Sequence, residues 1–325
     1  MTLNRRTLLK TMAGSPLALA LPSFAADAYP SKPVTLVVPQ PAGGGADALC
    51  RALQAKVQES LGQTIIIDNR AGAAGNIGTQ FGLGQAADGY TAVFVNLATV
   101  ALNPHLYSKT GYKVSDMQPV ILLAKVANII VANPGKVSAK NLKELIAQAK
   151  ATPGKLTYGT AGNGSGNHLG GEMLKKMAGI DLMHVPYKGG APAINAVLGG
   201  EIDLAVADPL AVLAHVKAGT LRAIAVTSPT RSKYLPDLPS VAETVPGYDA
   251  TSLAGIVVPK GTPAAAADKL NKAFGQALKN PEIASRLASQ LYEPSGAGPT
   301  EFASLMASED ARWAKLIKQL NVQLD

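Results

Sequence analysis

One stretch decides the fold of this 325-residue chain: Pro39-Gln40-Pro41-Ala42-Gly43-Gly44-Gly45-Ala46-Asp47. It follows the short apolar run 34–38 and precedes a segment with apolar residues at helical spacing, Leu49, Leu53, Val57 and Leu61. A glycine-rich turn between a strand and a helix directs several backbone N–H groups at one point, and the helix adds a partial positive charge there. The stretch therefore predicts a strand, an anion-binding turn and a helix in succession.

A second stretch of the same kind lies in the other half of the chain: Gly159-Thr160-Ala161-Gly162-Asn163-Gly164-Ser165-Gly166-Asn167-His168. Around both stretches, strand-like runs alternate with helical segments, which is typical of parallel α/β sheets with right-handed crossovers. Strands are predicted at 34–38, 64–68, 91–96, 156–160, 181–185, 202–207, 222–227 and 255–259, and the remainder after 259 is predicted to be helical. Ligands of such sheets bind at the carboxyl ends of the strands. We therefore expect two doubly wound α/β domains that face each other and close on a small carboxylate.

The first residues predict export from the cytoplasm of a bacterium. Asn4-Arg5-Arg6-Thr7-Leu8-Leu9-Lys10 is a twin-arginine pattern, and the apolar run 12–21 follows it. That run is shorter than the roughly 20 residues of a membrane span. Small residues then offer cleavage after Ala25 or after Ala28. We expect a periplasmic protein whose mature chain starts near Tyr29.

Composition and charge narrow the function classes. Hydrophobic residues make up 47% of the chain, which excludes a disordered protein. The formal net charge is +8, but the basic residues are scattered and few aromatic residues accompany them. A nucleic-acid groove fits this pattern poorly, whereas a diffuse positive field that attracts anions fits it well. The single cysteine, Cys50, cannot form an internal disulfide and is expected to pack in a helix.

The main rival interpretation is an NAD-dependent oxidoreductase with a Rossmann-type fold. Residues 43–48 satisfy G-x-G-x-x-A, and Asp68 follows where the ribose-binding acid would stand. Against this, four residues (39–42) separate the expected strand from the glycines, and the chain carries an export pattern. A third glycine cluster, 72–78, also makes Asp68 a turn residue. We therefore favour a binding protein.

The lack of catalytic and metal-binding signatures also favours a binding protein. The chain has no G-x-x-x-x-G-K-[ST] phosphate loop, and Asn163 interrupts a G-x-S-x-G pattern around Ser165. His168 and Glu172 lie one helical turn apart and could join His184 at a metal, but a helix-start histidine with a capping glutamate is the simpler interpretation. We expect a protein that is not an enzyme and that needs no metal or cofactor.

Several further segments resemble the periplasmic receptors of tripartite tricarboxylate transporters, the Bug receptors. Three segments are similar to that family. The first is the opening Tyr29-Pro30-Ser31-Lys32-Pro33-Val34 together with the first glycine-rich stretch, and the second is the stretch 159–169. The third is His184-Val185-Pro186-Tyr187-Lys188-Gly189-Gly190-Ala191-Pro192-Ala193. The match continues at Gly219-Thr220-Leu221-Arg222-Ala223-Ile224-Ala225-Val226 and at Pro236-Asp237-Leu238-Pro239-Ser240-Val241. The resemblance covers essentially the whole mature chain.

The resemblance implies a flytrap of two α/β domains joined by crossing strands, as in periplasmic binding proteins. The crossings are expected near 122–132 and 252–259. This gives an export signal at 1–28, a first domain of 29–125 with 254–325, and a second domain of 126–253. The resemblance also implies a monomer that delivers a carboxylate to membrane permease subunits. An exported carboxylate sensor for a signalling partner is the alternative.

Candidate ligand-binding residues follow from the two stretches and from this resemblance. The backbone of Ala42, Gly43 and Gly44 is expected to hold one end of the ligand, and Thr160, Gly162, Asn163, Gly164 and Ser165 the other. Asp47 is expected to cap its helix and shape the turn. Gln40 is expected to offer an amide donor and acceptor beside the anion. Three further candidates have two open roles each. Asn96 could line the pocket or form a turn, Tyr187 could contact the ligand or support the hinge, and Asp208 could meet an ammonium or hydroxyl group or be a solvated acid.

The chain departs from the family pattern at two places. The family commonly has Phe where Gln40 stands, and Trp with another aromatic residue where Leu253 and Ala254 stand. We expect Leu253 and Ala254 to form an open wall without aromatic plates. The expected ligand is therefore a polar aliphatic acid.

Overall fold

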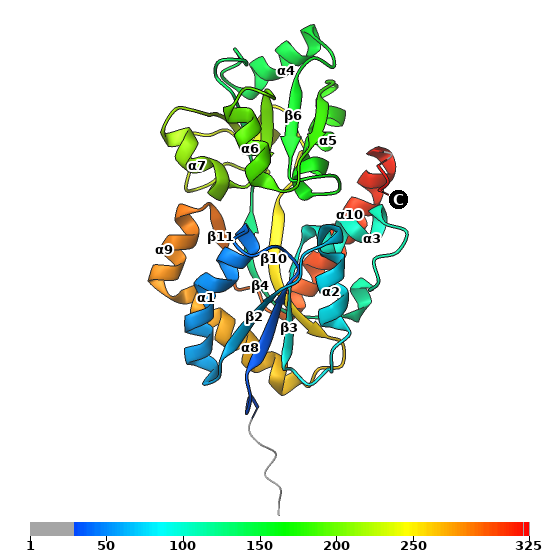
Figure 1. The fold of residues 1–325 in the computed structure, drawn as a ribbon, viewed down its shortest axis with the longest axis vertical. Coiled ribbons are helices and arrows are strands. Elements are labelled where there is room, and N and C mark those ends of the chain that lie inside the picture. The colour runs from blue at the N-terminus through cyan, green and yellow to red at the C-terminus, as the bar shows by residue number, and fades with distance from the viewer. Residues whose placement is uncertain (1–28, 321, 325) are drawn as a thin grey trace, which may run out of the picture.

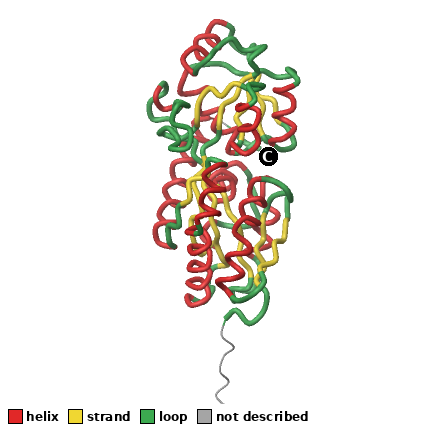
Figure 2. The backbone as a smooth tube through the Cα atoms, turned by 90° about the vertical axis from the view of Figure 1, so that its left-hand side faces the viewer, coloured by secondary structure: helices red, strands yellow, loops and turns green. Residues whose placement is uncertain are grey.

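The computed structural model describes residues 29–320 and 322–324, so the export signal predicted at 1–28 lies outside the described residues. The chain forms two α/β domains, each built around one mixed sheet (Figure 1). A view turned by 90° shows the same two lobes with the chain passing between them (Figure 2). Among the described residues, no helix combines the length and the apolar character needed to cross a bilayer.

The first domain contains a six-stranded sheet in the order β11-β4-β10-β3-β1-β2. Its strands are β1 Val34–Val38, β2 Ile65–Asn69, β3 Thr91–Asn96, β4 Met117–Val126, β10 Ser252–Pro259 and β11 Tyr292–Pro294. Strands β1, β2 and β3 are parallel, whereas β10 is antiparallel to β3 and β4. The carboxyl ends of β1 and β3 therefore lie at one edge, which faces the second domain.

Helices cover both faces of this sheet because successive strand residues point to opposite sides. In β3, Ala92 and Phe94 belong to the same apolar cluster as residues of α1 Gly45–Leu61 and α8 Ala264–Lys279, whereas Val93 and Val95 belong to the cluster that contains residues of α10 Pro299–Leu320. Cys50 is buried in α1, as expected. The other elements of this domain are α2 Asn76–Leu83, α3 Asn103–Leu106, α9 Pro281–Ser289 and the short turns η1 Ala73–Gly75, η2 Ala98–Leu102 and η3 Val114–Asp116.

The second domain contains a five-stranded sheet in the order β7-β6-β8-β5-β9. Strands β6, β7 and β8 are parallel, and β5 is antiparallel to β8 and β9. The strands are β5 Ile129–Ala132, β6 Thr157–Thr160, β7 Met183–Pro186, β8 Leu204–Ala207 and β9 Arg222–Val226. The helices are α4 Leu142–Ala151, α5 Gly166–Ala178, α6 Gly190–Leu198, α7 Pro209–Lys217 and the short η4 Val241–Glu243.

Two predictions about the sheets need correction. The remainder after 259 is not purely helical, because β11 pairs with β4 at the sheet edge. The sheets are not purely parallel either, because β4, β5 and β10, which lie where the chain passes between the domains, run against their neighbours. In Figure 1, β10 and β4 rise from the first domain towards the second.

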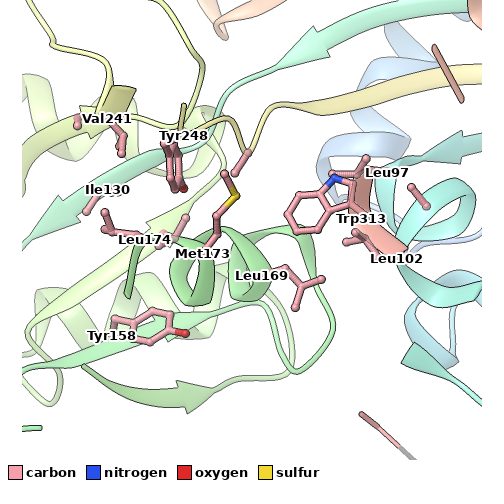
Figure 3. Close-up of a cluster of buried hydrophobic side chains, with 14 of the residues drawn as sticks. Leu97, Leu102, Ile130, Tyr158, Leu169, Met173, Leu174, Val241, Tyr248 and Trp313 are labelled. Carbon is pink, nitrogen blue, oxygen red and sulfur yellow. The ribbon is translucent and has the colours of Figure 1, made fainter. Parts of the chain in front are cut away.

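One buried apolar cluster joins the two domains. Leu97, Leu102 and Trp313 of the first domain belong to the same cluster as Leu169 and Met173 of the second (Figure 3). Trp313, the only tryptophan in the chain, is 0% exposed. The domains therefore meet through packed side chains as well as through the connecting strands.

Candidate ligand-binding site

The first glycine loop, residues 39–47, connects β1 to α1 in a conformation that needs glycine. Gly43 has φ +79°, where L side chains are strained, and Gly44 at the N-cap of α1 is extended. The Gly43 N–H donates to Asp47 Oδ2 at 2.9 Å, and the Gly44 N–H donates to the Pro41 carbonyl at 3.3 Å. These two donors, which we expected to face the ligand, are thus used inside the loop.

Asp47 holds this loop in shape. Its side chain is buried, and Arg51 Nε lies 2.9 Å from its Oδ2. Burial alone raises the pKa of Asp47, but the hydrogen bonds from Arg51 and the Gly43 N–H outweigh it, so the pKa is lowered. Asp47 is therefore an ionised carboxylate that is satisfied within the loop.

The free donors of the first loop lie at the start of α1. The N–H groups of Gly45 and Ala46 cannot bond within the helix. In the part of the chain that the structure describes, these two and the N–H of Ala42 donate to no backbone or side-chain acceptor. Together with the helix dipole they form a site for an anion.

The second glycine loop, residues 159–168, connects β6 to α5 in the same way. Ser165 is the N-cap of α5: its Oγ accepts from the His168 N–H at 3.2 Å and donates to the Gly162 carbonyl at 2.7 Å. The Gly162 N–H donates to Thr160 Oγ1 at 3.3 Å, and the Gly164 N–H donates to His168 Nδ1 at 3.2 Å. Among described residues, no acceptor is recorded for the N–H groups of Asn163, Gly166 and Asn167.

Both loops lie at the junction of the domains. Asp208 follows β8, next to β6 in the second sheet, and so lies at the same edge as the second loop. A Cβ built on Gly45 would stand 3.6 Å from Asp208 Oδ2. A Cβ built on Gly164 would stand 3.3 Å from Leu106 Cδ1, a residue of α3 in the first domain. Each loop therefore lies close to a residue of the other domain.

A histidine pair supports the second loop from behind. His168 and His184 stack with ring centroids 4.1 Å apart, and His184 Nε2 lies 2.7 Å from Thr160 Oγ1. Burial is the main cause that lowers the pKa of both rings, in His184 to about 4. Glu172 is engaged by Tyr158 and Lys175. Within the described residues, no cluster of three His, Cys, Asp or Glu side chains is arranged to hold a metal ion.

The remaining candidate residues take different positions. The main-chain carbonyl of Gln40 accepts from Asn69 Nδ2 at 3.2 Å. Asn96 Oδ1 accepts from the Thr99 N–H at 3.2 Å and so closes a turn after β3. Thr160 is 0% exposed and serves the loop through its hydroxyl. Tyr187 lies against the second loop, with its N–H bonded to the Thr160 carbonyl at 3.2 Å.

The expectation for Leu253 and Ala254 is wrong. Both lie on β10 and are only 3% and 4% exposed, so they form no open wall. Leu253 instead touches a separate cavity of about 230 Å³, lined by parts of β4, β10, β11, α10 and the segment after β9. Their substitution therefore gives no information about an aromatic plate in the site.

Sequence reasoning also missed part of the site. The free donors at Gly45, Ala46, Gly166 and Asn167 belong to the first helical turns, one or two residues beyond the glycines that we singled out. The signal was available, because the first N–H groups of any helix lack intrahelical partners. Tyr292 Oη, 3.4 Å from Asp208 Oδ2, carried no such signal, since it comes from the unpredicted strand β11.

Comparisons with known proteins show what the chain is similar to. Residues 49–322 match the model of the tripartite tricarboxylate transporter family receptor. The chain is 36% identical over 302 residues to Protein BugT of Bordetella pertussis, covering 92% of each chain. It resembles a protein of R. palustris solved with adipate (TM-score 0.84, 34% identity, 91% of this chain and 99% of that one). It also resembles MatC of Rhodopseudomonas palustris, solved with bound malate (TM-score 0.80, 28% identity, 89% and 100%).

Proposed function

Since this chain belongs to the tripartite tricarboxylate transporter family of receptors, we propose that it captures a small organic carboxylate in the periplasm and delivers it to membrane permease subunits. The observation that carries this proposal is the pair of helix starts, α1 and α5, which lie at the junction of the two domains with N–H groups that have no acceptor among the described residues. Helix starts bind sulfate, phosphate and carboxylate groups alike, and the neighbours solved with adipate and malate favour a carboxylate.

The proposed binding mode uses main-chain donors at both ends of the ligand. One carboxylate end binds at Ala42, Gly45 and Ala46, and the other polar end binds at Asn163, Gly166 and Asn167. Gly43, Gly44, Gly162, Gly164 and Ser165 shape the loops. Hydrogen bonds to a charged group contribute about 1.5–3 kcal/mol each, so a few of them suffice for micromolar affinity. Neither metal nor nucleotide takes part.

A thermal-shift screen of the protein from Tyr29 onward tests the proposal. A carboxylate at about 100 times its dissociation constant should raise the free energy of unfolding by about 2.7 kcal/mol. The library should hold aliphatic, hydroxylated, amino-substituted and aromatic acids, with NAD as the comparison for a dinucleotide site. Stabilisation by NAD and by no carboxylate would overturn the proposal, and turnover of a bound acid would show an enzyme.

A further inference from the structure

The segment 322–324, which follows α10, reaches the second glycine loop from the first domain. The Leu324 N–H donates to the carbonyl of Leu106, the last residue of α3, at 3.1 Å. Helix α3 is itself tied to α10, because His105 Nε2 lies 2.7 Å from Asp310 Oδ1. Leu324 and Leu106 are therefore held side by side as parts of the first domain.

Both leucines pack on Gly164, which belongs to the second domain. A Cβ built on Gly164 would collide with Leu324 Cδ1 and would stand 3.3 Å from Leu106 Cδ1. Gly164 is buried, although the preceding residue, Asn163, is exposed. Its φ of +74° and this close packing are two separate reasons why the position needs glycine. Apolar side chains of the first domain thus cover the backbone of the loop.

Gly164 lies in the middle of the proposed binding loop. The N–H groups that are proposed to hold the ligand begin one residue before it, at Asn163, and continue two residues after it, at Gly166. The Gly164 N–H donates to His168 Nδ1 at 3.2 Å, so this bond fixes the loop from within the second domain. Leu324 fixes the same loop from the first domain.

The contact between Leu324 and Gly164 depends on how the two domains are placed relative to each other. Separation of the domains pulls the leucine off the loop and exposes apolar surface on both sides to water, which is unfavourable. The contact therefore favours the arrangement in which the starts of α1 and α5 can hold one ligand between them.

We infer that Leu324 is a positioning residue of the binding site, which packs on the second glycine loop from the first domain and slows the release of a bound carboxylate. The inference rests on the proposed capture of a carboxylate at the starts of α1 and α5. It assigns a role in binding to a segment that lies outside both glycine loops.

Stopped-flow measurements of ligand dissociation test the inference. The probes are malate, adipate and the acid that gives the largest shift in the thermal screen. Leu324→Ala removes the atoms that touch Gly164, so it should raise the dissociation rate constant by about tenfold and leave the association rate constant within about threefold. Leu324→Met nearly conserves volume and apolar character and should stay within about threefold of the native rate.

Leu83→Ala is the matched control. Leu83 ends α2 in the first domain and is half-buried against the same apolar cluster as Leu324, whereas the atoms nearest to the Cβ position of Gly164 belong to Leu324 and Leu106. Both alanine variants should lower the free energy of unfolding without ligand, but only Leu324→Ala should speed dissociation.

Leu324→Gln gives a second measurement, because it keeps the length of the side chain and replaces its apolar end; the same rise in the dissociation rate constant is expected. Native dissociation rates in Leu324→Ala and Leu324→Gln, or an equal rise in Leu83→Ala, would overturn the inference and leave the proposed function standing. Failure of every carboxylate in the screen to bind the native protein would overturn both.

Discussion

At the residue scale, His168 and His184 tie the second glycine loop to the core of the second domain. The Gly164 N–H donates to His168 Nδ1, so this nitrogen must be unprotonated, and the stacked His184 ring meets Thr160 at the end of β6. A proton on either ring would place a charge between partly buried groups. The shape of the loop therefore depends on a neutral histidine pair.

Stability should consequently fall with acidification. Burial lowers the pKa of His184 to about 4, whereas the pKa of an unfolded histidine lies near its ordinary value of 6.5. Between these values the unfolded state binds more protons, so the free energy of unfolding decreases as the pH falls from 6.5 to 4. After allowance for partial exposure, this loss should be on the order of 2 kcal/mol.

Urea titrations at pH 7, 6, 5 and 4 measure this effect. His184→Gln should show a shallower loss of stability over this range than the native protein, because it removes the titrating ring. His215→Gln, on α7 and outside the pair, is the control and should follow the native curve. Equal slopes for all three proteins would contradict the role of the histidine pair.

At the element scale, the starts of α1 and α5 are the proposed anion sites, and Gly166 offers the sharpest test of them. Gly166 is the first residue of α5, and a Cβ there would meet nothing within 4 Å. Proline is tolerated at this helical position, and Ser165 has the extended conformation that a following proline requires. Gly166→Pro therefore removes one N–H while the fold is kept.

Gly166→Ala is the matched control, because it adds a side chain and keeps the N–H. Gly166→Pro should weaken carboxylate binding by about 10- to 100-fold, the equivalent of one hydrogen bond to a charged group. Gly166→Ala should stay within about threefold of the native protein. Isothermal titration with the best acid from the screen gives the dissociation constants of both variants. Similar affinities for the two variants would argue against main-chain recognition at α5.

The elements also show what the sequence allows one to predict. The strand-turn-helix units were predictable because glycines with positive φ, such as Gly43 and Gly164, stand between a buried strand and a periodic helix. Asp47 shapes the turn by accepting from the Gly43 N–H, as its place in the first turn suggested, but it does not cap α1, whose N-cap Gly44 has no side-chain cap. Which N–H groups stay free was not predictable, since it depends on contacts such as Gly164 to His168. Strand β11 was missed because its three residues are held by pairing with β4 and carry no pattern of their own.

At the scale of the whole molecule, the two domains share an apolar cluster and connecting strands, so we expect them to unfold as one cooperative unit. Trp313 lies in that cluster and is the only tryptophan, so its fluorescence reports on the junction of the domains. We predict that its unfolding curve coincides with that of far-UV circular dichroism, as two-state behaviour requires. Two separate transitions would show that the domains unfold independently.

The first turns of α1 and α5 are proposed to hold a carboxylate ligand between the domains. A crystal structure of the protein from Tyr29 onward, with the acid that stabilises it most, would show whether they do. We predict ligand oxygens within hydrogen-bonding distance of the N–H groups of Gly45 or Ala46 and of Gly166 or Asn167. A ligand bound instead in the cavity beside Leu253, or held by side chains with both helix starts unoccupied, would contradict it.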